Sequence, residues 1–371
     1  MSIGVYIHIP YCKSKCHYCD FLSSSNFSSL GAYLDKLKEE IGYYSDTLSD
    51  TVIDTVFIGG GTPSALPRGA LRGLFDTLSK RFKVKGGAEI TVEANPDTID
   101  VEKVEEYKQF CTRVSLGVQS LDNKVLKYAG RLHDETVARN ALKLLSKTNL
   151  NVSADLILGL PLDSVEGVNR STKKILDYGI GHLSAYGLKV EDGTKFHRDF
   201  KSGVTTFPDD DMVTDMYDTV VKVAKDYGLM RYEVSNFAKI GEECRHNVGY
   251  WKRLPYLGLG IGAHSLIDDV RYENPREMNS YLDAHDFDKF RKIESTLTKE
   301  DSLFEEIMLR LRLSEGIDVE EINVRYGIDF FERFKEPICK LNKVLECNSK
   351  KIRVKEEYFY ALNSIIVEFL E

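Results

Sequence analysis

The sequence predicts an α/β protein built on a partial (β/α)6 barrel of the TIM type, followed by a mainly helical C-terminal part with a small β wing. Strand-like apolar runs alternate with segments whose apolar residues recur about every 3.6 residues, which is typical of parallel β/α units. The sequence shows six such runs, and a closed barrel of this type needs eight units. We therefore expect an open barrel.

The predicted strands cover residues 5–9, 55–59, 89–93, 113–119, 153–158 and 182–188. Helices between them are predicted from three apolar sets: Tyr33, Leu34, Leu37 and Ile41; Leu71, Leu74, Phe75 and Leu78; and Val137, Ala141, Leu142 and Leu145. In parallel β/α arrays the chemistry collects at the carboxyl ends of the strands. Candidate site residues are therefore sought there.

The pattern changes from about residue 209. Apolar residues between 213 and 224 predict one long amphipathic helix: Val213, Met216, Tyr217, Val220, Val221 and Ala224. Helices are then expected over 303–313, 319–326 and 330–345, with a β-pair at 352–355 and 358–362. We divide the chain into residues 1–235 and 236–371, with a winged-helix-like module at about 298–371.

Such a module could dock nucleic acid or act as a lid or partner-binding unit. Acidic residues along it oppose phosphate binding and favour the second interpretation: Glu305, Glu306, Asp318, Glu320 and Glu321. The whole chain carries 50 Lys and Arg against 58 Asp and Glu, a net charge of −8. Nucleic-acid binding, which needs many cations to neutralise phosphates, is not expected.

Seven cysteines, an odd number in 371 residues, do not predict a disulfide framework. The N-terminal residues contain no pattern of a secretory signal, and no apolar run reaches the roughly 18–20 residues of a membrane span. We therefore expect a cytoplasmic protein with reduced thiols, in which closely spaced cysteines indicate metal binding.

Cys12, Cys16 and Cys19 form a C-x3-C-x2-C motif that supplies three thiolates. One alternative is a zinc knuckle with His8 or His17 as fourth ligand, because structural zinc takes four ligands. Another is a chance group of buried thiols. The hypothesis we favour is a 4Fe–4S cluster, in which three thiolates leave one iron open to a substrate or cofactor.

Polar residues follow or end several predicted strands. Residues 59–63 (GGGTP) could bring backbone amides and carbonyls close to a ligand, although a plain tight turn would have the same sequence. Glu93, Gln119, Arg131 and Asp155 could contact a zwitterionic cofactor with a ribose. The alternatives are a surface role for Arg131 and a capping role for Asp155.

Motifs spread over nearly the whole chain are shared with one family. They are residues 6–10 (YIHIP), the cysteine loop, 59–63, 117–120 (GVQS), 155–161 (DLILGLP), 232–238 (YEVSNFA), 245–251 (RHNVGYW) and 258–264 (GLGIGAH). The chain resembles radical S-adenosylmethionine (radical SAM) proteins of the oxygen-independent coproporphyrinogen III oxidase family, and within it the heme-chaperone branch.

The resemblance implies a 4Fe–4S cluster on Cys12, Cys16 and Cys19. It also implies contacts to S-adenosyl-L-methionine from residues at the matching positions: Tyr6, Gly60, Gly61, Thr62, Glu93, Gln119, Arg131 and Asp155. The oxidases have a further cysteine where this chain has Phe21, and a longer segment before the cluster loop than the eleven residues preceding Cys12. Both differences favour the chaperone branch, and the alternative is an oxidase or another radical enzyme acting on a tetrapyrrole.

For the chaperone branch, the resemblance implies that the protein binds heme and delivers it to apo-hemoproteins such as respiratory enzymes. His246 is a candidate axial ligand, with Cys244 as its rival, because imidazole binds heme iron well. A hydrogen-bonded loop histidine is the alternative. Cys111, Cys339 and Cys347 are expected to be packing thiols in helices. A homodimer and peripheral membrane association are further expectations from the resemblance.

Overall fold

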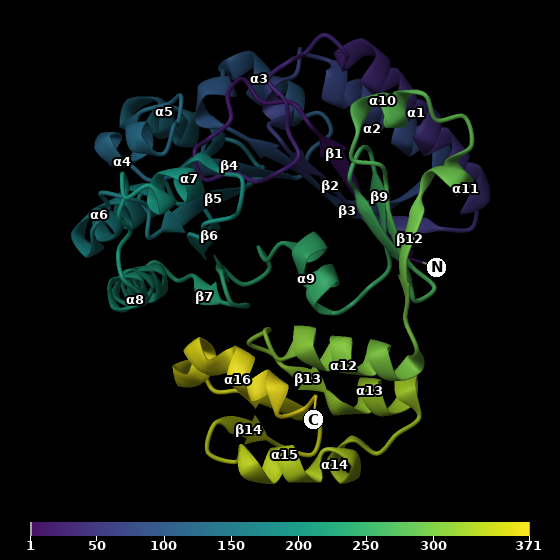
Figure 1. Cartoon of the computed structure of the whole chain (residues 1–371), viewed down its shortest axis with the longest axis vertical. Coiled ribbons are helices and arrows are strands. Elements are labelled where there is room, and N and C mark those ends of the chain that lie inside the picture. Colours follow the sequence, from purple (N-terminus) through teal and green to yellow (C-terminus); the bar gives the residue numbers. More distant parts are fainter. Residues whose placement is uncertain (1, 371) are drawn as a thin grey trace.

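The computed structural model describes residues 2–370, and in this part a twelve-stranded sheet curves into an open arc (Figure 1). The strand order is β12-β11-β10-β9-β1-β2-β3-β4-β5-β6-β8-β7. Strands β1 to β6 are parallel and confirm the predicted array: β1 (Ser2–Ile9), β2 (Val52–Gly60), β3 (Lys83–Ala94), β4 (Arg113–Gln119), β5 (Asn151–Leu158) and β6 (His182–Gly187). The last strand ends one residue earlier than predicted.

Short strands extend both sides of this parallel array. On one side β8 (Asn236–Ala238) pairs antiparallel with β6, and β7 (Met230–Arg231) pairs with β8. On the other side β9 (Tyr256–Leu259) is parallel to β1. Antiparallel strands then follow: β10 (His264–Ile267), β11 (Val270–Glu273) and β12 (Lys292–Thr296). Since β7 and β12 are the two edges of the sheet, the barrel is open, as predicted.

Helices lie along the outside of the arc (Figure 1): α1 (Leu30–Thr47), α2 (Ala70–Arg81), α3 (Val101–Tyr107), α4 (Asn123–Tyr128), α5 (Glu135–Leu145), α6 (Val165–Leu176) and α8 (Asp210–Asp226). Each buries one apolar stripe, such as Tyr33, Leu37 and Ile41 of α1. Capping side chains help to fix where these helices begin. At the start of α5, the Asp134 carboxylate accepts a hydrogen bond from the Val137 N–H. Shorter elements complete this part: η1 (Pro63–Ala65), η2 (Pro96–Thr98), α7 (Lys195–Lys201), α9 (Arg245–Trp251), α10 (Met278–Leu282) and α11 (Phe287–Phe290).

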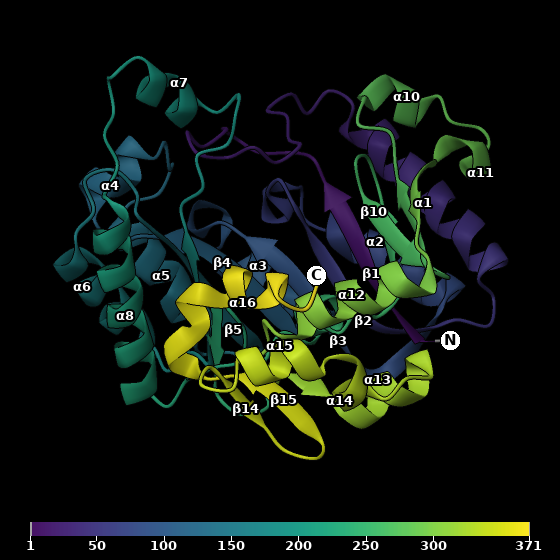
Figure 2. The same cartoon turned by 60° about the horizontal axis from the view of Figure 1, so that its bottom comes forward.

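The C-terminal residues form a module below the arc in Figure 1, and Figure 2 shows it from its outer side with the parallel strands behind it. Its helices are α12 (Lys299–Arg310), α13 (Val319–Tyr326), α14 (Phe330–Arg333), α15 (Lys335–Lys340), η3 (Glu356–Ala361) and α16 (Leu362–Val367). Its sheet has the order β13 (Ile317–Asp318), β15 (Lys351–Val354), β14 (Leu345–Cys347). The module has a hydrophobic core of its own, which includes Ile307, Phe330 and Ile352.

Two predictions about this module are wrong in detail. The helix expected over 330–345 is broken at Phe334, because Pro337 has no N–H for the carbonyl of Arg333 and its ring would clash with that carbonyl. The strand expected at 358–362 is helical in η3 and α16, since Phe359, Leu362 and Ile366 recur at helical spacing and are all buried. The partners of β15 are instead β14 and β13.

Strands β8 to β12 lie beyond residue 235 in the same sheet as β1 to β6. The division into residues 1–235 and 236–371 stays a prediction. Over residues 2–370, no helix combines the length and the apolar character that a membrane span requires.

Candidate functional site

A cavity of about 940 Å³ lies inside the arc. Alternate residues of β4 and β6 line it along their whole lengths: Arg113, Ser115, Gly117 and Gln119 from β4, and His182, Ser184 and Tyr186 from β6. In a closed TIM barrel such inward positions hold branched apolar side chains that fill the interior. The polar residues here instead surround an open volume, at the upper end of the size range of ligand pockets.

All residues predicted for the cluster and for S-adenosyl-L-methionine line this cavity, together with His246, the favoured heme ligand. They are Tyr6, Cys12, Cys16, Cys19, Gly60, Gly61, Thr62, Glu93, Gln119, Arg131, Asp155 and His246. The fold thus brings together residues that are up to 240 positions apart in the chain.

The cysteine loop follows β1 and is tied to its neighbours by backbone hydrogen bonds. The Cys12 N–H donates to the Ser24 carbonyl at 3.0 Å, and the His17 N–H donates to the Ala129 carbonyl at 3.0 Å. All three thiols are half-buried. Among residues 2–370, no group of three or more His, Cys, Asp or Glu side chains is already gathered as for a single metal ion. The three thiols thus face one cavity without forming a closed, zinc-like shell.

The histidines proposed as fourth zinc ligands make other contacts. His8 Nε2 lies 2.9 Å from the Leu22 carbonyl oxygen, and its Nδ1 lies 3.0 Å from the Tyr6 hydroxyl. His17 Nδ1 lies 2.7 Å from the Tyr128 carbonyl oxygen. These contacts favour the cluster hypothesis over a zinc knuckle.

Protein donors around the thiols fit a cluster of iron and sulfide. Arg131 Nη1 donates to Cys16 Sγ at 3.3 Å, and the Thr62 hydroxyl donates to Cys12 Sγ at 3.3 Å. Burial raises the pKa of Cys12, and it raises that of Cys19 to about 11, so both thiols are protonated at neutral pH without a cation. Iron ions bound to the sulfurs would reverse this balance and hold them as thiolates.

The GGGTP loop contacts β1, β3 and the cysteine loop closely. A Cβ on Gly60, whose φ is +107°, would lie 2.4 Å from the His8 ring, and one on Gly61 would lie 2.8 Å from the carbonyl oxygens of Ile9 and Tyr11. Only glycine fits these positions.

The backbone N–H groups of this loop already have acceptors inside the protein. Those of Gly60, Gly61 and Thr62 donate to Glu93 Oε2, the Ile9 carbonyl and the Tyr11 carbonyl at 3.0, 2.8 and 2.8 Å. The prediction that these amides are free for a ligand is therefore wrong. A ligand would meet the loop through carbonyl oxygens or by direct packing.

Glu93 and Asp155 are half-buried carboxylates that face the cavity and have raised pKa values. Desolvation, with the nearby Asp155 charge, raises the pKa of Glu93 to about 7. Burial also raises the pKa of Asp155, although the Ser115 hydroxyl donates to it at 3.0 Å. Asp155 lies in the middle of β5 rather than capping an end, so its carboxylate is held inside the cavity. Both groups can exchange a proton or accept a hydrogen bond from an ammonium or hydroxyl.

Gln119 and Arg131 occupy constrained positions. Gln119 ends β4 with φ at +67°, a sparsely populated conformation outside glycine, next to an irregularity in the pairing with β5. Arg131 is not a surface residue: its Nη2 donates to Gly117 O at 2.7 Å and to Asn95 Oδ1 at 2.8 Å. Its Nε is buried and has no hydrogen-bond partner in the described residues.

His246 is buried against β2 with both ring nitrogens in contact with hydroxyls. Nδ1 lies 2.8 Å from Thr55 Oγ1, and Nε2 lies 2.9 Å from the Tyr250 hydroxyl. The ring stacks on Phe57 with centroids 5.2 Å apart, and desolvation lowers the pKa of His246 to about 3. This geometry favours the alternative of a hydrogen-bonded structural histidine. To bind iron, the imidazole would have to give up one hydrogen bond.

The four cysteines outside the cysteine loop match the predictions made for them only in part. Cys244 is fully buried, its thiol lies against Glu89, and it does not line the cavity, so the geometry gives no support to its role as a rival ligand. Cys111 is buried as expected, although in the connection between α3 and β4 rather than in a helix. Cys339 and Cys347 are exposed, so the prediction that they are packing thiols is wrong.

Sequence reasoning missed several residues of the cavity. Asn95 joins two predicted residues, because its Nδ2 donates to Thr62 Oγ1 at 3.1 Å while its Oδ1 accepts from Arg131. Arg113, His182 and Tyr186 line the wall of the arc. The sequence contained an indication of this wall: Arg113, Ser115 and Gln119 share one face of the first predicted strand, and His182, Ser184 and Tyr186 share one face of the other.

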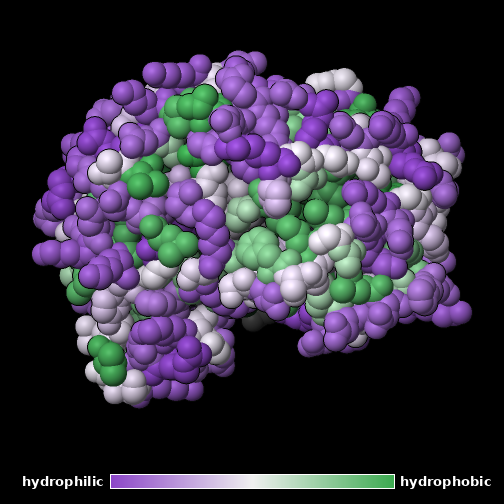
Figure 3. Space-filling view, turned by 90° about the horizontal axis from the view of Figure 1, so that it is seen from above, coloured by the Kyte–Doolittle hydropathy of each residue, from purple (hydrophilic) through white to green (hydrophobic). Residues whose placement is uncertain are grey.

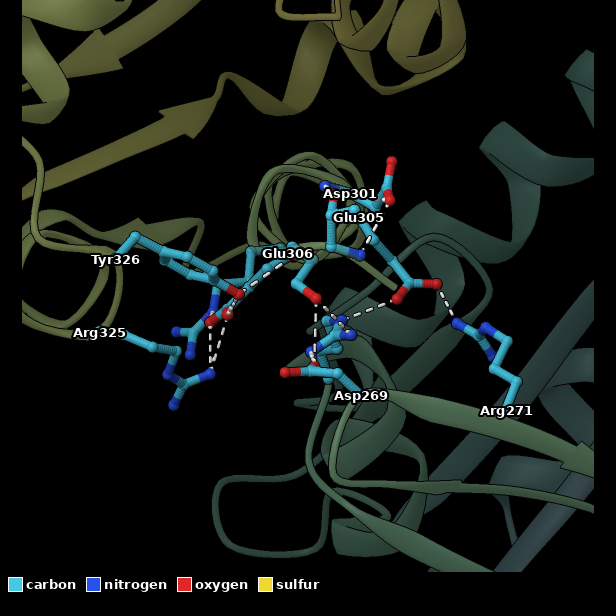
Figure 4. A network of polar contacts seen from close by, with 11 residues as sticks. Asp269, Arg271, Asp301, Glu305, Glu306, Arg325 and Tyr326 are labelled. Carbon is cyan, nitrogen blue, oxygen red and sulfur yellow. Dashed lines mark hydrogen bonds and ion pairs between the residues drawn. The ribbon is translucent and has the colours of Figure 1, made fainter. Parts of the chain in front are cut away.

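The C-terminal module borders the cavity, where Glu305 of α12 takes part in an ion-pair network (Figure 4). Arg253 pairs with Glu305 of α12 at 2.7 Å and with Asp269 at 2.8 Å, and Arg271 also pairs with Glu305. Arg253, Arg271 and Glu305 all line the cavity. The module thus borders the cavity, and its role as a lid or partner-binding unit stays a prediction.

Apolar side chains are also exposed beside the cavity. Phe21, in the position of the oxidases' extra cysteine, lines the cavity and is 58% exposed, and Tyr186 is 40% exposed. From above, the molecular surface is mostly hydrophilic, with apolar side chains gathered near the middle of the face (Figure 3).

Comparisons with known proteins place the chain in a family. The Radical SAM superfamily matches residues 6–175, and the HemN C-terminal domain matches residues 297–355. The heme chaperone HemW of Lactococcus lactis is 32% identical over 372 residues, which cover 99% of this chain and 97% of that protein. The chain belongs to the HemW family. The HemW proteins of Bacillus subtilis and Escherichia coli are 33% and 34% identical and match 87% and 85% of the chain, or 87% and 83% of their own lengths.

The branch predicted from Phe21 and the shared motifs is therefore confirmed. Among solved structures, coproporphyrinogen III oxidase (HemN) of Escherichia coli, described as a radical SAM enzyme, has a TM-score of 0.84. It covers 99% of this chain and 89% of its own, with 21% identity. This similarity confirms the fold: an open α/β barrel with a helical C-terminal part.

Proposed function

We propose that this HemW-family protein binds heme and delivers it to apo-hemoproteins, respiratory enzymes among them. The observation that carries the proposal is the identity of 32–34% to proteins named heme chaperone over 85–99% of this chain. The likeness to the oxidase is one of fold alone at 21% identity. Activity as a coproporphyrinogen oxidase is not expected.

We propose that Cys12, Cys16 and Cys19 hold a 4Fe–4S cluster and that the part of the cavity wall beside them, which includes Thr62 and Arg131, binds S-adenosyl-L-methionine. When bound, these groups supply one-electron reductive chemistry. Arg131 lies beside Cys16, where its positive charge offsets the negative charge of the thiolates. With a pKa of about 7, Glu93 can accept a hydrogen bond from an ammonium group or donate one to a carboxylate. Asp155, oriented by Ser115, is suited to hydroxyl groups.

Heme would occupy the same cavity, where Tyr6, Phe57, Tyr250 and Tyr256 offer ring faces or edges for a porphyrin. His246 as axial ligand stays part of the proposal. A homodimer, association with a membrane surface and a cytoplasmic location belong to it as well.

The test is a hemin titration of the purified protein, followed by visible absorbance. We expect saturable binding near one heme per chain, weakened in His246→Ala. His133→Ala is the matched control, because His133 is a buried histidine that does not line the cavity. Absence of specific hemin binding, together with turnover of coproporphyrinogen III under anaerobic reducing conditions, would contradict the proposal and favour an oxidase.

A further inference from the structure

Arg113 is a buried cation with unused hydrogen-bond donors. It begins β4, is 2% exposed and lines the cavity. Within residues 2–370 its guanidinium makes no hydrogen bond or ion pair, and its Nε is fully buried without a partner. A guanidinium stays charged at any physiological pH, so burying it without partners is costly.

Anionic groups near Arg113 act on it only through space. The carboxylates that act on it electrostatically are Glu89 and Asp155. Glu89 already accepts the N–H groups of Arg245 and His246 at 2.9 Å each. The Asp155 carboxylate accepts from Ser115 and Ser153. These acceptors are therefore engaged, and the donors of Arg113 are left for a ligand.

Arg113 lies at the opposite end of the cavity from the cysteine loop. Six strand steps separate it from Gln119 at the other end of β4, which corresponds to about 20 Å at roughly 3.3 Å per residue. His182 at the start of β6 lies at the same end, as do Arg253 and Tyr256 close to the C-terminal module.

The walls around this end combine aromatic and cationic groups. Phe57, Tyr250 and Tyr256 line the cavity here, together with Arg253 and Arg271. Both of these arginines already pair with Glu305, whereas Arg113 has no such partner among the residues described. The expected ligand is therefore flat and apolar with a carboxylate at its edge, because a guanidinium binds a carboxylate through two parallel hydrogen bonds.

We propose that Arg113 binds a propionate carboxylate of the heme, so that the end of the cavity at the start of the strands is a carboxylate subsite for the tetrapyrrole. The inference rests on the proposed heme binding and adds where and how the carboxylate end of the molecule is held.

The experiment compares hemin with hemin dimethyl ester, whose propionates carry no charge, by absorbance titration of the full chain. A charge-assisted hydrogen-bonded pair predicts that the wild type binds hemin roughly 10–100-fold more tightly than the ester. Arg113→Gln should lower hemin affinity to that of the ester, and Arg113→Lys should retain part of the preference. Arg231→Gln is the matched control, a buried arginine outside the cavity, and should keep the full preference.

The outcomes separate this inference from the proposed function. A wild type that binds neither compound contradicts heme binding itself. If the wild type binds hemin and folded Arg113→Gln keeps the full preference over the ester, Arg113 is not the carboxylate site. If Arg113→Gln does not fold, as judged by circular dichroism, an unreduced preference in Arg113→Lys overturns the inference. Loss of S-adenosyl-L-methionine affinity in either variant, with the hemin preference intact, would assign Arg113 to the cofactor instead.

Discussion

Glu306 of α12 is expected to be the side chain on which the C-terminal module most depends. Its carboxylate is fully buried and accepts from Arg310 Nε at 2.7 Å, from Arg325 Nη1 at 2.8 and 2.9 Å, and from the Tyr326 hydroxyl at 2.7 Å (Figure 4). Glu306→Gln replaces one acceptor oxygen with a donor and leaves these donors facing it.

Breaking a buried ion pair from one side costs about 3–5 kcal/mol. Because glutamine keeps one acceptor oxygen, we expect Glu306→Gln to lower the free energy of unfolding by the lower end of this range, about 3 kcal/mol. The matched control is Glu321→Gln: Glu321 pairs with the same Arg310 and Arg325, but its side chain is 43% exposed. At such an exposed site, the substitution should lower the free energy of unfolding by no more than about 1 kcal/mol.

Urea unfolding measures the difference. With a slope of about 1–3 kcal/mol per molar, a loss of 3 kcal/mol lowers the midpoint by roughly 1–3 M. Trp251, the single tryptophan, ends α9, which contacts α12, so its fluorescence reports on this part of the fold. Equal destabilisation by the two substitutions would refute the argument that burial makes Glu306 the critical partner.

Three further predictions concern the cofactor sites and pH. Cys16→Ala should abolish the iron–sulfur absorbance after anaerobic reconstitution, and an unchanged iron content would refute the cluster assignment. Asp155→Ala should weaken S-adenosyl-L-methionine binding while sparing the cluster; equal affinity would remove Asp155 from the site. Burial raises the pKa of Glu40 to about 7 despite donors from Tyr281, Gly260 and Asn274. Because the folded pKa is raised, this carboxyl destabilises the folded state increasingly as pH rises from about 4.5 to 7, by on the order of 3 kcal/mol in total. Glu40→Gln should remove that slope from urea-unfolding free energies measured across this range, and a persisting slope would assign it to other groups.

Periodicity was enough to predict the parallel array, because each strand is a short apolar run bounded by turn residues. It failed in the C-terminal module, where single residues decide the outcome: Pro337 breaks a predicted helix, and Phe359, Leu362 and Ile366 form a buried helical face where a strand was predicted. Such effects depend on which side of a short segment meets the core, and a short apolar run does not reveal this.

The candidate site was predicted from motifs, and the cavity brings its residues together. What the sequence could not show is how their hydrogen bonds are distributed. The N–H groups of Gly60 and Thr62 and both nitrogens of His246 have partners inside the protein, whereas Arg113 has none among residues 2–370. These differences depend on contacts between segments far apart in the chain, which local patterns do not record.

The central claim is that this protein transfers heme to an acceptor. The most direct test measures the rate of heme transfer from the hemin-loaded protein to an apo-cytochrome of a respiratory enzyme. Direct delivery predicts that the transfer rate rises with acceptor concentration and exceeds the rate of spontaneous hemin loss, which apomyoglobin in excess measures separately. A rate that equals the spontaneous loss at every acceptor concentration would contradict a chaperone function and leave only passive heme binding.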